Sequence, residues 1–328
     1  MDPLSDLLRM VRLDGAYFYC VEAAEPWSVS TRHARELAPR IMPGSDHLIP
    51  YHILTQGRCF VGVVGEEQIE MAAGDVIVFP QGDGHVLSSA RGLRVGDDAI
   101  SGYPEHYPHT AVFGSDRPPS ASFVCGFLGC DLRPFNPLLA ALPRRLHMPA
   151  MSDGWLDGFT RRLTEEVRLG RAGANGVLTR LAELMFLDVL RRHLEKLPAG
   201  QTGWLAGLRD ELVGRVLTLL HARPGHPWTL DELAREAASS RSNVAQRFTE
   251  LVGQPPMQYL AQWRMQVAAN HLTGSSAKLA AIAAEVGYES EAAFSRAFKR
   301  AFGLPPARYR KRSEQQGALH RGTAGSAG

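Results

Sequence analysis

The sequence contains no apolar run of about 18 residues, the length that a membrane-spanning helix requires. Residues 1–15 also lack the basic and apolar regions of an export signal. We therefore expect a cytoplasmic protein that makes no membrane contact. Cysteine is scarce as well: all four cysteines lie in the front part of the chain. In a reducing compartment they are expected to be free thiols rather than a disulfide framework.

What the sequence does contain is an uneven distribution of charge. The 328 residues are 45% hydrophobic and 21% charged, which is ordinary for about two globular domains. Residues 207–312 carry 15 Lys and Arg against 9 Asp and Glu, whereas residues 1–206 carry 20 against 24. A basic excess confined to one part favours a polyanionic partner for that part, although a solvated basic face has the same composition.

The front part of the chain has the pattern of a β domain. Between residues 16 and 130, short apolar segments alternate with Gly and Pro, as in residues 51–65, 68–80 and 122–129. This pattern predicts a barrel or sandwich. Residues 91–120, which are rich in Gly, Pro and Asp, predict a long loop.

From Trp155 onward the apolar spacing becomes helical and predicts two helices. The second carries an apolar stripe made of Leu181, Leu184, Met185, Val189 and Leu194. Such a stripe is buried either against the β domain or in a dimer interface. Residues 198–207 predict a linker, and the small polar residues after Arg312 predict a disordered tail.

An internal repeat is the most informative feature of the rear part. Residues 229–253 are echoed by residues 278–303, with a one-residue difference in length near the turn. Each copy predicts a short helix, a tight turn and a second helix, which is the helix-turn-helix unit. In the first copy Ala238, Ser239 and Ser240 form the turn. In the second, Gly287 can take a positive φ and Ser290 caps the following helix.

Residues 256–274 predict a helix that connects the copies, with Pro256 at its start and Gly274 as its C-cap. A helix of about 17 residues within this stretch is about 25 Å long, which brings recognition helices one DNA turn apart, about 34 Å, within reach. The residues expected to contact DNA are Arg241, Ser242, Asn243, Gln246 and Arg247 of the first recognition helix, Arg264 of the connecting helix, and Ser290, Glu291, Ala292, Ser295, Arg296 and Lys299 of the second. Arg and Gln can recognise base edges, and Ser and Lys more often bind phosphate. The alternative for any one of them is a solvated surface position.

Residues 207–310 resemble the DNA-binding domain of the AraC/XylS family of bacterial regulators. The resemblance rests on residues 233–260 and 282–310, and on the closing Gly303, Pro305, Pro306, Tyr309 and Arg310. It implies recognition of a promoter, commonly with activation through contact with RNA polymerase.

Residues 74–85 fit the second cupin signature, in which Gly74, Pro80, Gly82 and His85 hold the fixed positions. His85 is expected to begin a strand and, with His52, to point into the barrel as a ligand pocket. Two imidazoles make a weak metal site. His47, His106 or His109 could complete one, and the alternative is a polar pocket without metal. We expect no metal and no other cofactor.

The front domain as a whole resembles the cupin-type N-terminal domains of some AraC-like regulators. Certain relatives respond to oxidants such as reactive chlorine through paired cysteines, and Cys20 and Cys125 hold similar positions here. The resemblance therefore implies that these two are redox-sensing candidates. The alternative is that they are small buried hydrophobic residues.

Together these features predict an α+β multidomain protein with a cupin-like β-barrel, a helical hairpin and an all-α tandem helix-turn-helix domain. The predicted domains are residues 1–150 (sensing), 151–206 (hairpin, dimerisation and linker), 207–312 (DNA-binding) and 313–328 (disordered tail). We expect a dimeric transcriptional activator that binds double-stranded promoter DNA and RNA polymerase, modulated by a small-molecule or oxidant effector, and not an enzyme. The alternative is a metal-dependent cupin enzyme in the barrel.

Overall fold

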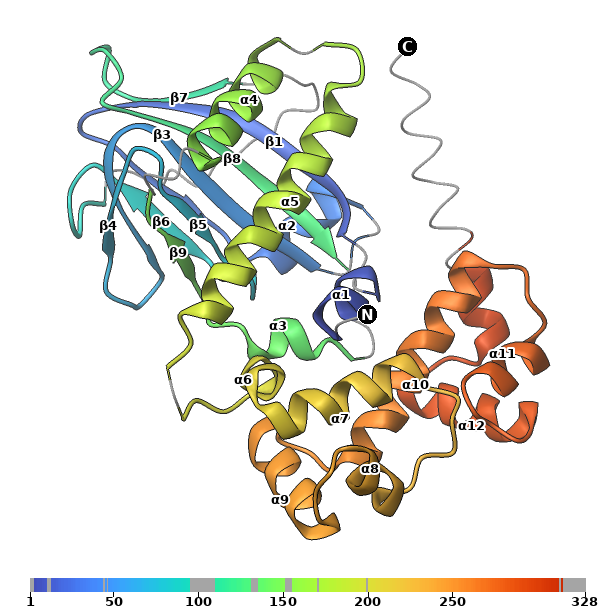
Figure 1. Ribbon diagram of the computed structural model, residues 1–328. Helices are drawn as coiled ribbons and strands as arrows, with labels where there is room; N and C mark the ends of the chain where they lie inside the picture. The colour runs from blue at the N-terminus through green and yellow to red at the C-terminus, as the bar shows by residue number, and fades with distance from the viewer. Residues whose placement is uncertain are drawn as a thin grey trace. The chain divides into compact units, whose positions relative to one another are not determined.

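The computed structural model describes residues 3–10, 13–43, 45, 47–94, 110–130, 135–150, 155–169, 171–198, 200–312 and 314. The chain divides into two compact units, shown in Figure 1. We call residues 13–131 and 142–195 the barrel unit, and residues 1–12, 132–141 and 196–328 the helical unit. Within the described residues, no helix is long and apolar enough to cross a membrane.

The described part of the barrel unit holds a nine-stranded sheet whose main path runs β2-β6-β3-β8-β1-β7, with β4 and β5 paired to β3, and β9 paired to β5. The strands are β1 (Leu13–Ala24), β2 (Ser28–Thr31), β3 (His47–Val63), β4 (Ile69–Ala72), β5 (Val76–Val78), β6 (His85–Ser88), β7 (Thr110–Gly114), β8 (Ala121–Cys130) and β9 (Leu146–Met148). A short helix, α2 (Ala34–Ile41), lies between β2 and β3.

The long strand β3 is what curls the sheet. Its first half pairs with β8 and β5, and its second half pairs with β4 and β6. The register with β8 shifts between Leu54 and Gln56, next to Gly57, whose φ is +83°. A side chain at Gly57 would collide with the carbonyl oxygen of Ser120, so only glycine fits where β3 bends.

The predicted loop over residues 91–120 is only partly correct. Thr110–Gly114 forms β7, a strand that pairs in parallel with β1. Its residues alternate between exposed and half-buried, as in an edge strand, and so offer no buried apolar pattern to recognise. Residues 95–109 lie outside the described residues.

The predicted hairpin consists of α4 (Trp155–Leu169) and α5 (Ala174–Glu195), which pack on each other and on β1. In Figure 1 both helices lie across one face of the sheet. Of the predicted stripe, Met185 and Val189 are buried, but Leu184 is 47% exposed. The buried face is instead made of Leu178, Ala182, Met185, Phe186, Val189 and Leu190. The hairpin therefore belongs to the barrel unit and is not a separate segment.

The helical unit is made of α1 (Pro3–Met10), α3 (Pro137–Ala141), α6 (Trp204–Arg209), α7 (Glu211–Ala222), α8 (Leu230–Glu236), α9 (Arg241–Val252), α10 (Pro256–Gly274), α11 (Leu279–Glu285) and α12 (Glu291–Phe302). The predicted linker ends too late, because Trp204 is buried and begins α6. Two segments distant in sequence, α1 and α3, also belong here: α1 packs on α7 and α10, and α3 packs on α6. The predicted tail after Arg312, apart from residue 314, lies outside the described residues.

The predicted repeat is confirmed as two helix-turn-helix units. Helices α8 and α11 have 7 residues each, and α9 and α12 have 12 each. Ser240 and Ser290 cap α9 and α12, each accepting a hydrogen bond from the backbone N–H three residues later. Phe248 and Phe298 are fully buried behind the two helices. The fold is thus α+β, with a curled sheet in one unit and tandem helix-turn-helix motifs in the other.

The connecting helix α10 spans the predicted residues, with Pro256 at its first turn. Gly274 is its last residue rather than its C-cap, a position that Ser275 holds in extended conformation. The αL caps occur instead at Gly253 and Gly303, which end the two recognition helices.

The turn of the first motif contains a strained residue. Ala238 has a φ of +53°, and Gly287 holds the equivalent position of the second motif with a φ of +80°. An L-residue in this region costs about 1–2 kcal/mol, partly offset by the lower backbone entropy of Ala in the unfolded chain. We expect Ala238→Gly to raise the free energy of unfolding by about 0.5–1 kcal/mol. Urea titration measures this, and Ala245→Gly inside α9 is the control, expected to lower stability by about 1 kcal/mol.

Candidate functional site

The outward face of α9 carries the five residues predicted for the first recognition helix, and all of them are exposed: Arg241, Ser242, Asn243, Gln246 and Arg247. The two arginines are held by carboxylates: Arg241 lies 3.4 Å from Asp231, and Arg247 lies 3.0 Å from Asp210. These pairs are exposed, so they are weak and DNA phosphates can compete for the guanidinium groups.

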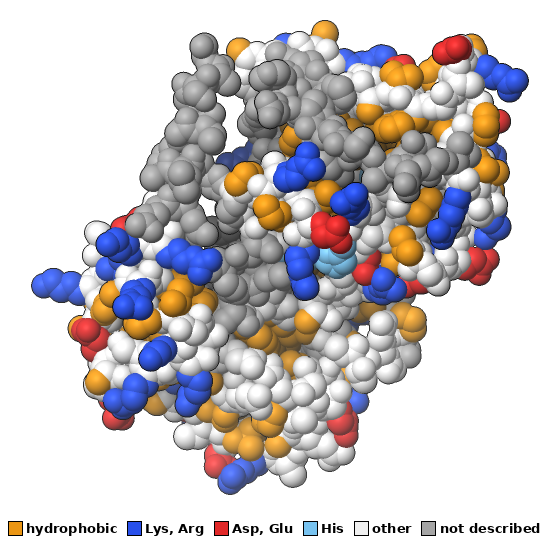
Figure 2. All heavy atoms as spheres, turned by 180° about the vertical axis from the view of Figure 1, so that it is seen from behind, with side chains coloured by type: hydrophobic (Ala, Val, Ile, Leu, Met, Phe, Trp, Pro, Cys, Tyr) orange, Lys and Arg blue, Asp and Glu red, His pale blue; other side chains and the backbone are white. Residues whose placement is uncertain are grey.

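The second recognition helix, α12, presents its charges more freely. Glu291, Ala292, Arg296 and Lys299 are exposed, whereas Ser295 is half-buried. Among the described residues, neither Arg296 nor Lys299 forms an ion pair. Figure 2 shows Lys and Arg side chains gathered on the helical unit. The α12 cations are therefore available for an anionic partner.

Arg264 differs from the other predicted contacts because its guanidinium is engaged within the unit. It donates to the backbone carbonyls of Pro224 and His226, both at 2.7 Å. The half-buried side chain also lies beside Gly287, where a Cβ would approach the guanidinium to 2.9 Å. Arg264 therefore braces the residues before α8 against the turn of the second motif.

This position predicts a loss of stability from Arg264→Ala. Two backbone carbonyls would lose a charged donor, and each such hydrogen bond contributes about 1.5–3 kcal/mol. We expect the free energy of unfolding to fall by about 2–4 kcal/mol in urea titration. Loss of DNA affinity without loss of stability would contradict the bracing role and would return Arg264 to the DNA interface.

In the barrel unit, three predicted residues meet in one buried chain of hydrogen bonds. The Nε2 atoms of His52 and His85 are 2.7 Å apart, and His52 Nδ1 lies 2.9 Å from Cys125 Sγ. His85 Nδ1 lies 2.9 Å from the carbonyl oxygen of Asp83. Both imidazoles are buried, and His85 opens β6 as predicted.

The carbonyl at one end of this chain fixes the protons along it. Because the oxygen of Asp83 can only accept, His85 Nδ1 donates, and the Nε2 of a neutral His85 must accept. His52 Nε2 therefore donates to His85, and His52 Nδ1 is left to accept from the Cys125 thiol. With both imidazoles neutral, Cys125 is the donor to His52 Nδ1, so its thiol is protonated.

Burial favours the neutral form of all three groups, His52, His85 and Cys125. It lowers the pKa of His85 to about 4 and that of His52 well below the usual value, with His85 adding to the second shift. It also raises the pKa of the Cys125 thiol well above its usual value. Both histidines thus fold as neutral groups and must bind protons on unfolding in acid.

This linkage predicts acid sensitivity. Because the folded pKa of His85 is lowered to about 4, its contribution is intact above about pH 6.5 and is lost as pH falls toward 4. The expected loss is about 3 kcal/mol over that interval. The difference between the urea midpoints at pH 7 and pH 4.5 should be smaller in His85→Gln than in the unaltered chain. The substitution leaves the neighbouring residues His52, Asp83 and Cys125 in place. An equal pH dependence in both would contradict the neutral pair.

The cupin fold often holds a metal, but the donor set here does not fit one. No group of three or more His, Cys, Asp or Glu suited to a metal occurs within the described residues. Cys125 and His85 contact opposite nitrogens of His52, so the three donors do not converge on one point. His47 instead hydrogen bonds the carbonyl oxygen of Pro80 at 2.7 Å. His106 and His109 lie outside the described residues.

The two predicted thiols lie on the paired strands β1 and β8 but face opposite ways. Tyr19 is the register partner of Cys125, and Cys20 is the partner of Val124. Since directly opposed residues share a face, Cys20 and Cys125 point to opposite faces of the sheet. Burial also raises the pKa of Cys20 to about 11, which disfavours the reactive thiolate. A disulfide between these two would require movement of the backbone.

Sequence reasoning missed Trp27 and Thr31, which line the barrel interior beside His52 and Cys125. Trp27, Val29 and Thr31 alternate by two along the chain, a period that would have placed them on one face. Sequence reasoning also missed the docking of α1 in the helical unit, where Asp6 lies 4.0 Å from the buried His221. No local pattern in residues 3–10 indicates that partner.

Comparison with known proteins gives matches to both units. Residues 2–195 match the family described as Cupin, and residues 233–312 match the family described as Helix-turn-helix domain. A putative AraC-like transcription regulator of Streptomyces lividans is 34% identical over 315 residues, covering 95% of this chain and 98% of that protein. The RCS-specific HTH-type transcriptional activator RclR of Escherichia coli is 27% identical, covering 83% of this chain and 87% of that protein. Among solved structures, the DNA-binding domain of AdpA in complex with a target DNA is 29% identical, covering 33% of this chain and 96% of that chain, with a TM-score of 0.31.

Proposed function

The chain belongs to the AraC-like transcriptional regulators, which bind DNA through a helix-turn-helix domain that follows a cupin domain, and we propose how its two recognition helices contact DNA. Helices α9 and α12 enter successive major grooves of one duplex face. The contacts are made by Arg241, Ser242, Asn243, Gln246 and Arg247 in the first groove, and by Ser290, Glu291, Ala292, Ser295, Arg296 and Lys299 in the second.

The observation that carries this proposal is the equivalence of the two motifs. Their recognition helices have the same length, the same serine cap and the same buried phenylalanine, and both keep a polar outer face exposed. The 19-residue α10 separates them by a rod of about 28 Å, which suits one turn of B-DNA.

Selection from a random duplex pool with the full chain tests the proposal. We expect an enriched site with two half-sites about 10.5 base pairs apart, centre to centre. Affinity should fall steeply as salt rises, because each phosphate contact releases a counterion. Equal affinity for the enriched site and for a scrambled duplex would contradict specific recognition.

We further propose that the barrel unit modulates DNA binding through two covalent connections. The neighbouring strands β1 and β8 lead directly into residues 1–12 and 132–141, which belong to the helical unit. There the ring of Phe135 lies 5.3 Å from that of Tyr259, whose hydroxyl contacts Trp204 and His221. A change in β1 and β8 therefore reaches the core of the helical unit along the chain itself.

Thiol oxidation is one candidate trigger of this modulation, favoured by the likeness to RclR and by the contact between Cys125 and His52. A promoter fusion measured with and without hypochlorite tests it. Loss of induction in Cys125→Ser or Cys20→Ser supports the thiol trigger, and unchanged induction in both removes it. Cys130→Ser is the matched control, since Cys130 is also buried on β8.

We propose that the protein acts as a cytoplasmic homodimer that activates transcription through RNA polymerase, without catalysis. The outer face of α5 carries Val177, Leu181 and Leu184, spaced as neighbours along a helix, and Val177 and Leu184 are exposed. Sedimentation of Leu184→Glu tests the dimer, because a charged side chain on this face should disrupt the interface and leave only monomers.

Stoichiometric iron or manganese in the purified protein would favour the alternative function, a metal-dependent cupin enzyme.

A further inference from the structure

The two recognition helices differ in how their polar side chains are bound within the protein. On α9, each of the five proposed DNA contacts already has a partner in the helical unit. The pairs are Arg241 with Asp231, Ser242 with Ser240, Asn243 with Ser239, Gln246 with Glu250 and Arg247 with Asp210. On α12, by contrast, Ser295, Arg296 and Lys299 form no side-chain hydrogen bond or ion pair with any other described residue. The first helix must therefore exchange more internal contacts for contacts to DNA.

The Asp210–Arg247 pair is the least solvated of the two arginine pairs on α9. The side chain of Asp210 is 17% exposed, whereas that of Asp231 is 71% exposed. Arg247 donates from Nε to Oδ2 of Asp210 at 3.1 Å, and its Nη2 lies 3.0 Å from the same oxygen. Water and salt screen a partly buried pair less than an exposed one. This pair is thus better able to compete with DNA than the pair between Arg241 and Asp231.

The backbone around Asp210 fixes the position of its carboxylate. Asp210 follows the last residue of α6 and is the N-cap of α7. Its Oδ1 accepts a hydrogen bond from the backbone N–H of Val213 at 2.9 Å, while its Oδ2 faces Arg247. Because the cap holds the carboxylate in place, Asp210 cannot follow the guanidinium of Arg247 toward DNA.

We propose that Asp210 is a positioning residue that holds Arg247 on the protein and competes with DNA for its guanidinium. The inference rests on the proposed docking of α9 and identifies a residue that limits the affinity of this motif. DNA gains the contact with Arg247 only by breaking the pair, which leaves the carboxylate of Asp210 without a cation beside the phosphates. The first motif therefore binds DNA more weakly than its polar face alone would allow.

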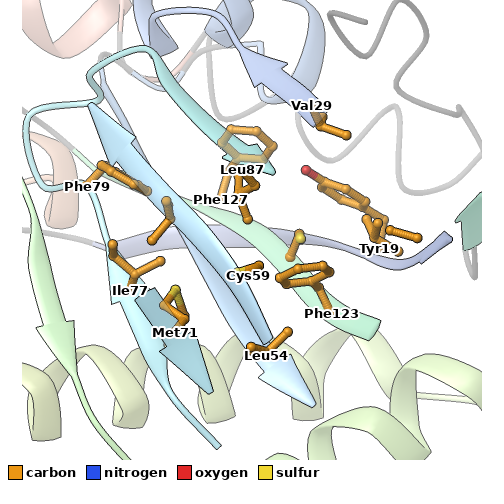
Figure 3. Close-up of a cluster of buried hydrophobic side chains, with 14 of the residues drawn as sticks. Tyr19, Val29, Leu54, Cys59, Met71, Ile77, Phe79, Leu87, Phe123 and Phe127 are labelled. Carbon is orange, nitrogen blue, oxygen red and sulfur yellow. The ribbon is translucent and has the colours of Figure 1, made fainter. Parts of the chain in front are cut away.

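The chain also connects Asp210 to the barrel unit. Figure 3 shows Phe123 and Phe127, both from β8, among the clustered side chains of the barrel core. Strand β8 leads into residues 132–141, where α3 packs on α6, and α6 ends next to Asp210. A shift of α6 therefore moves the carboxylate relative to α9, so that a change in β8 reaches the first motif.

The test compares variants of the full chain by fluorescence anisotropy on the selected duplex. Asp210→Asn and Asp210→Ser remove the charge and keep an N-cap acceptor, so the urea midpoint should change little. We expect each to raise affinity by about 3- to 10-fold, the effect of losing one partly buried ion pair. A purely structural role would lower affinity instead. In the Arg247→Ala background, the same two substitutions should raise affinity by less than about 2-fold.

Glu211→Gln is the matched control, because it removes the same charge from the next residue, which pairs with Arg215 rather than with α9. It should change affinity by less than about 2-fold. An equal gain from Glu211→Gln, a gain that persists without Arg247, or no gain from either Asp210 variant would overturn the inference. The same variants on a scrambled duplex separate the two claims. A gain that depends on Arg247, with no preference for the selected duplex, would overturn only the proposed function.

Discussion

Arg296→Ala is expected to weaken binding to the selected site by about 5- to 150-fold, which corresponds to about 1–3 kcal/mol. Arg296 is exposed on α12 and forms no ion pair among the described residues, so its guanidinium does not have to leave a partner to reach DNA. If it contacts a base, the loss should be largest on the selected site and small on scrambled duplex. Fluorescence anisotropy on both duplexes measures the difference.

Two further variants give this prediction its controls. Lys299→Ala should weaken both duplexes alike and reduce the salt slope by about 1, as expected for a phosphate contact. Arg191→Ala removes the same charge from an exposed position on α5 and should leave affinity unchanged. If Arg191→Ala weakens binding as much as Arg296→Ala, overall charge rather than the α12 face determines affinity.

Phe298→Ala should lower the stability of the helical unit by about 3–5 kcal/mol and abolish specific DNA binding. Its ring is fully buried, with ring centroids 4.2 Å from Phe302 and 5.3 Å from Tyr309. Removing it leaves a cavity directly behind the recognition helix, so α12 loses the support that fixes its angle. Thermal unfolding and anisotropy on the same preparation measure both effects.

Phe298→Leu is the matched control, since it keeps an apolar side chain and should cost less than half as much. The equivalent change, Phe248→Ala, tests the first motif, where the ring lies 5.7 Å from that of Tyr259. Retention of full specific affinity by Phe298→Ala would show that the second motif does not contribute to recognition.

The helical half could be predicted closely because its determinants are local. Capping serines, turn glycines and the spacing of Leu233, Ile282 and the phenylalanines act within a few residues, so the bounds of α9 and α10 follow from the sequence. The internal contacts of Arg264 could not be predicted, for the opposite reason. Its partners, the carbonyls of Pro224 and His226, are about 40 residues away along the chain, and no local pattern announces them.

The barrel was predicted in outline but not in its contacts. The glycines and proline of residues 74–85 fix the turn and place His85, and period-2 alternation turns His52 inward. Whether two residues on neighbouring strands share a face depends on register, which hydrogen bonds between distant segments determine. For that reason the sequence could nominate Cys20 and Cys125 but could not show that they lie on opposite faces.

The arrangement of α9 and α12 on DNA is most directly tested by methylation interference at guanine N7 on the selected duplex. Two clusters of interfering guanines on one face, about one helical turn apart, are predicted, with the cluster assigned to α12 lost in Arg296→Ala. A single cluster, unchanged by that substitution, would contradict the account.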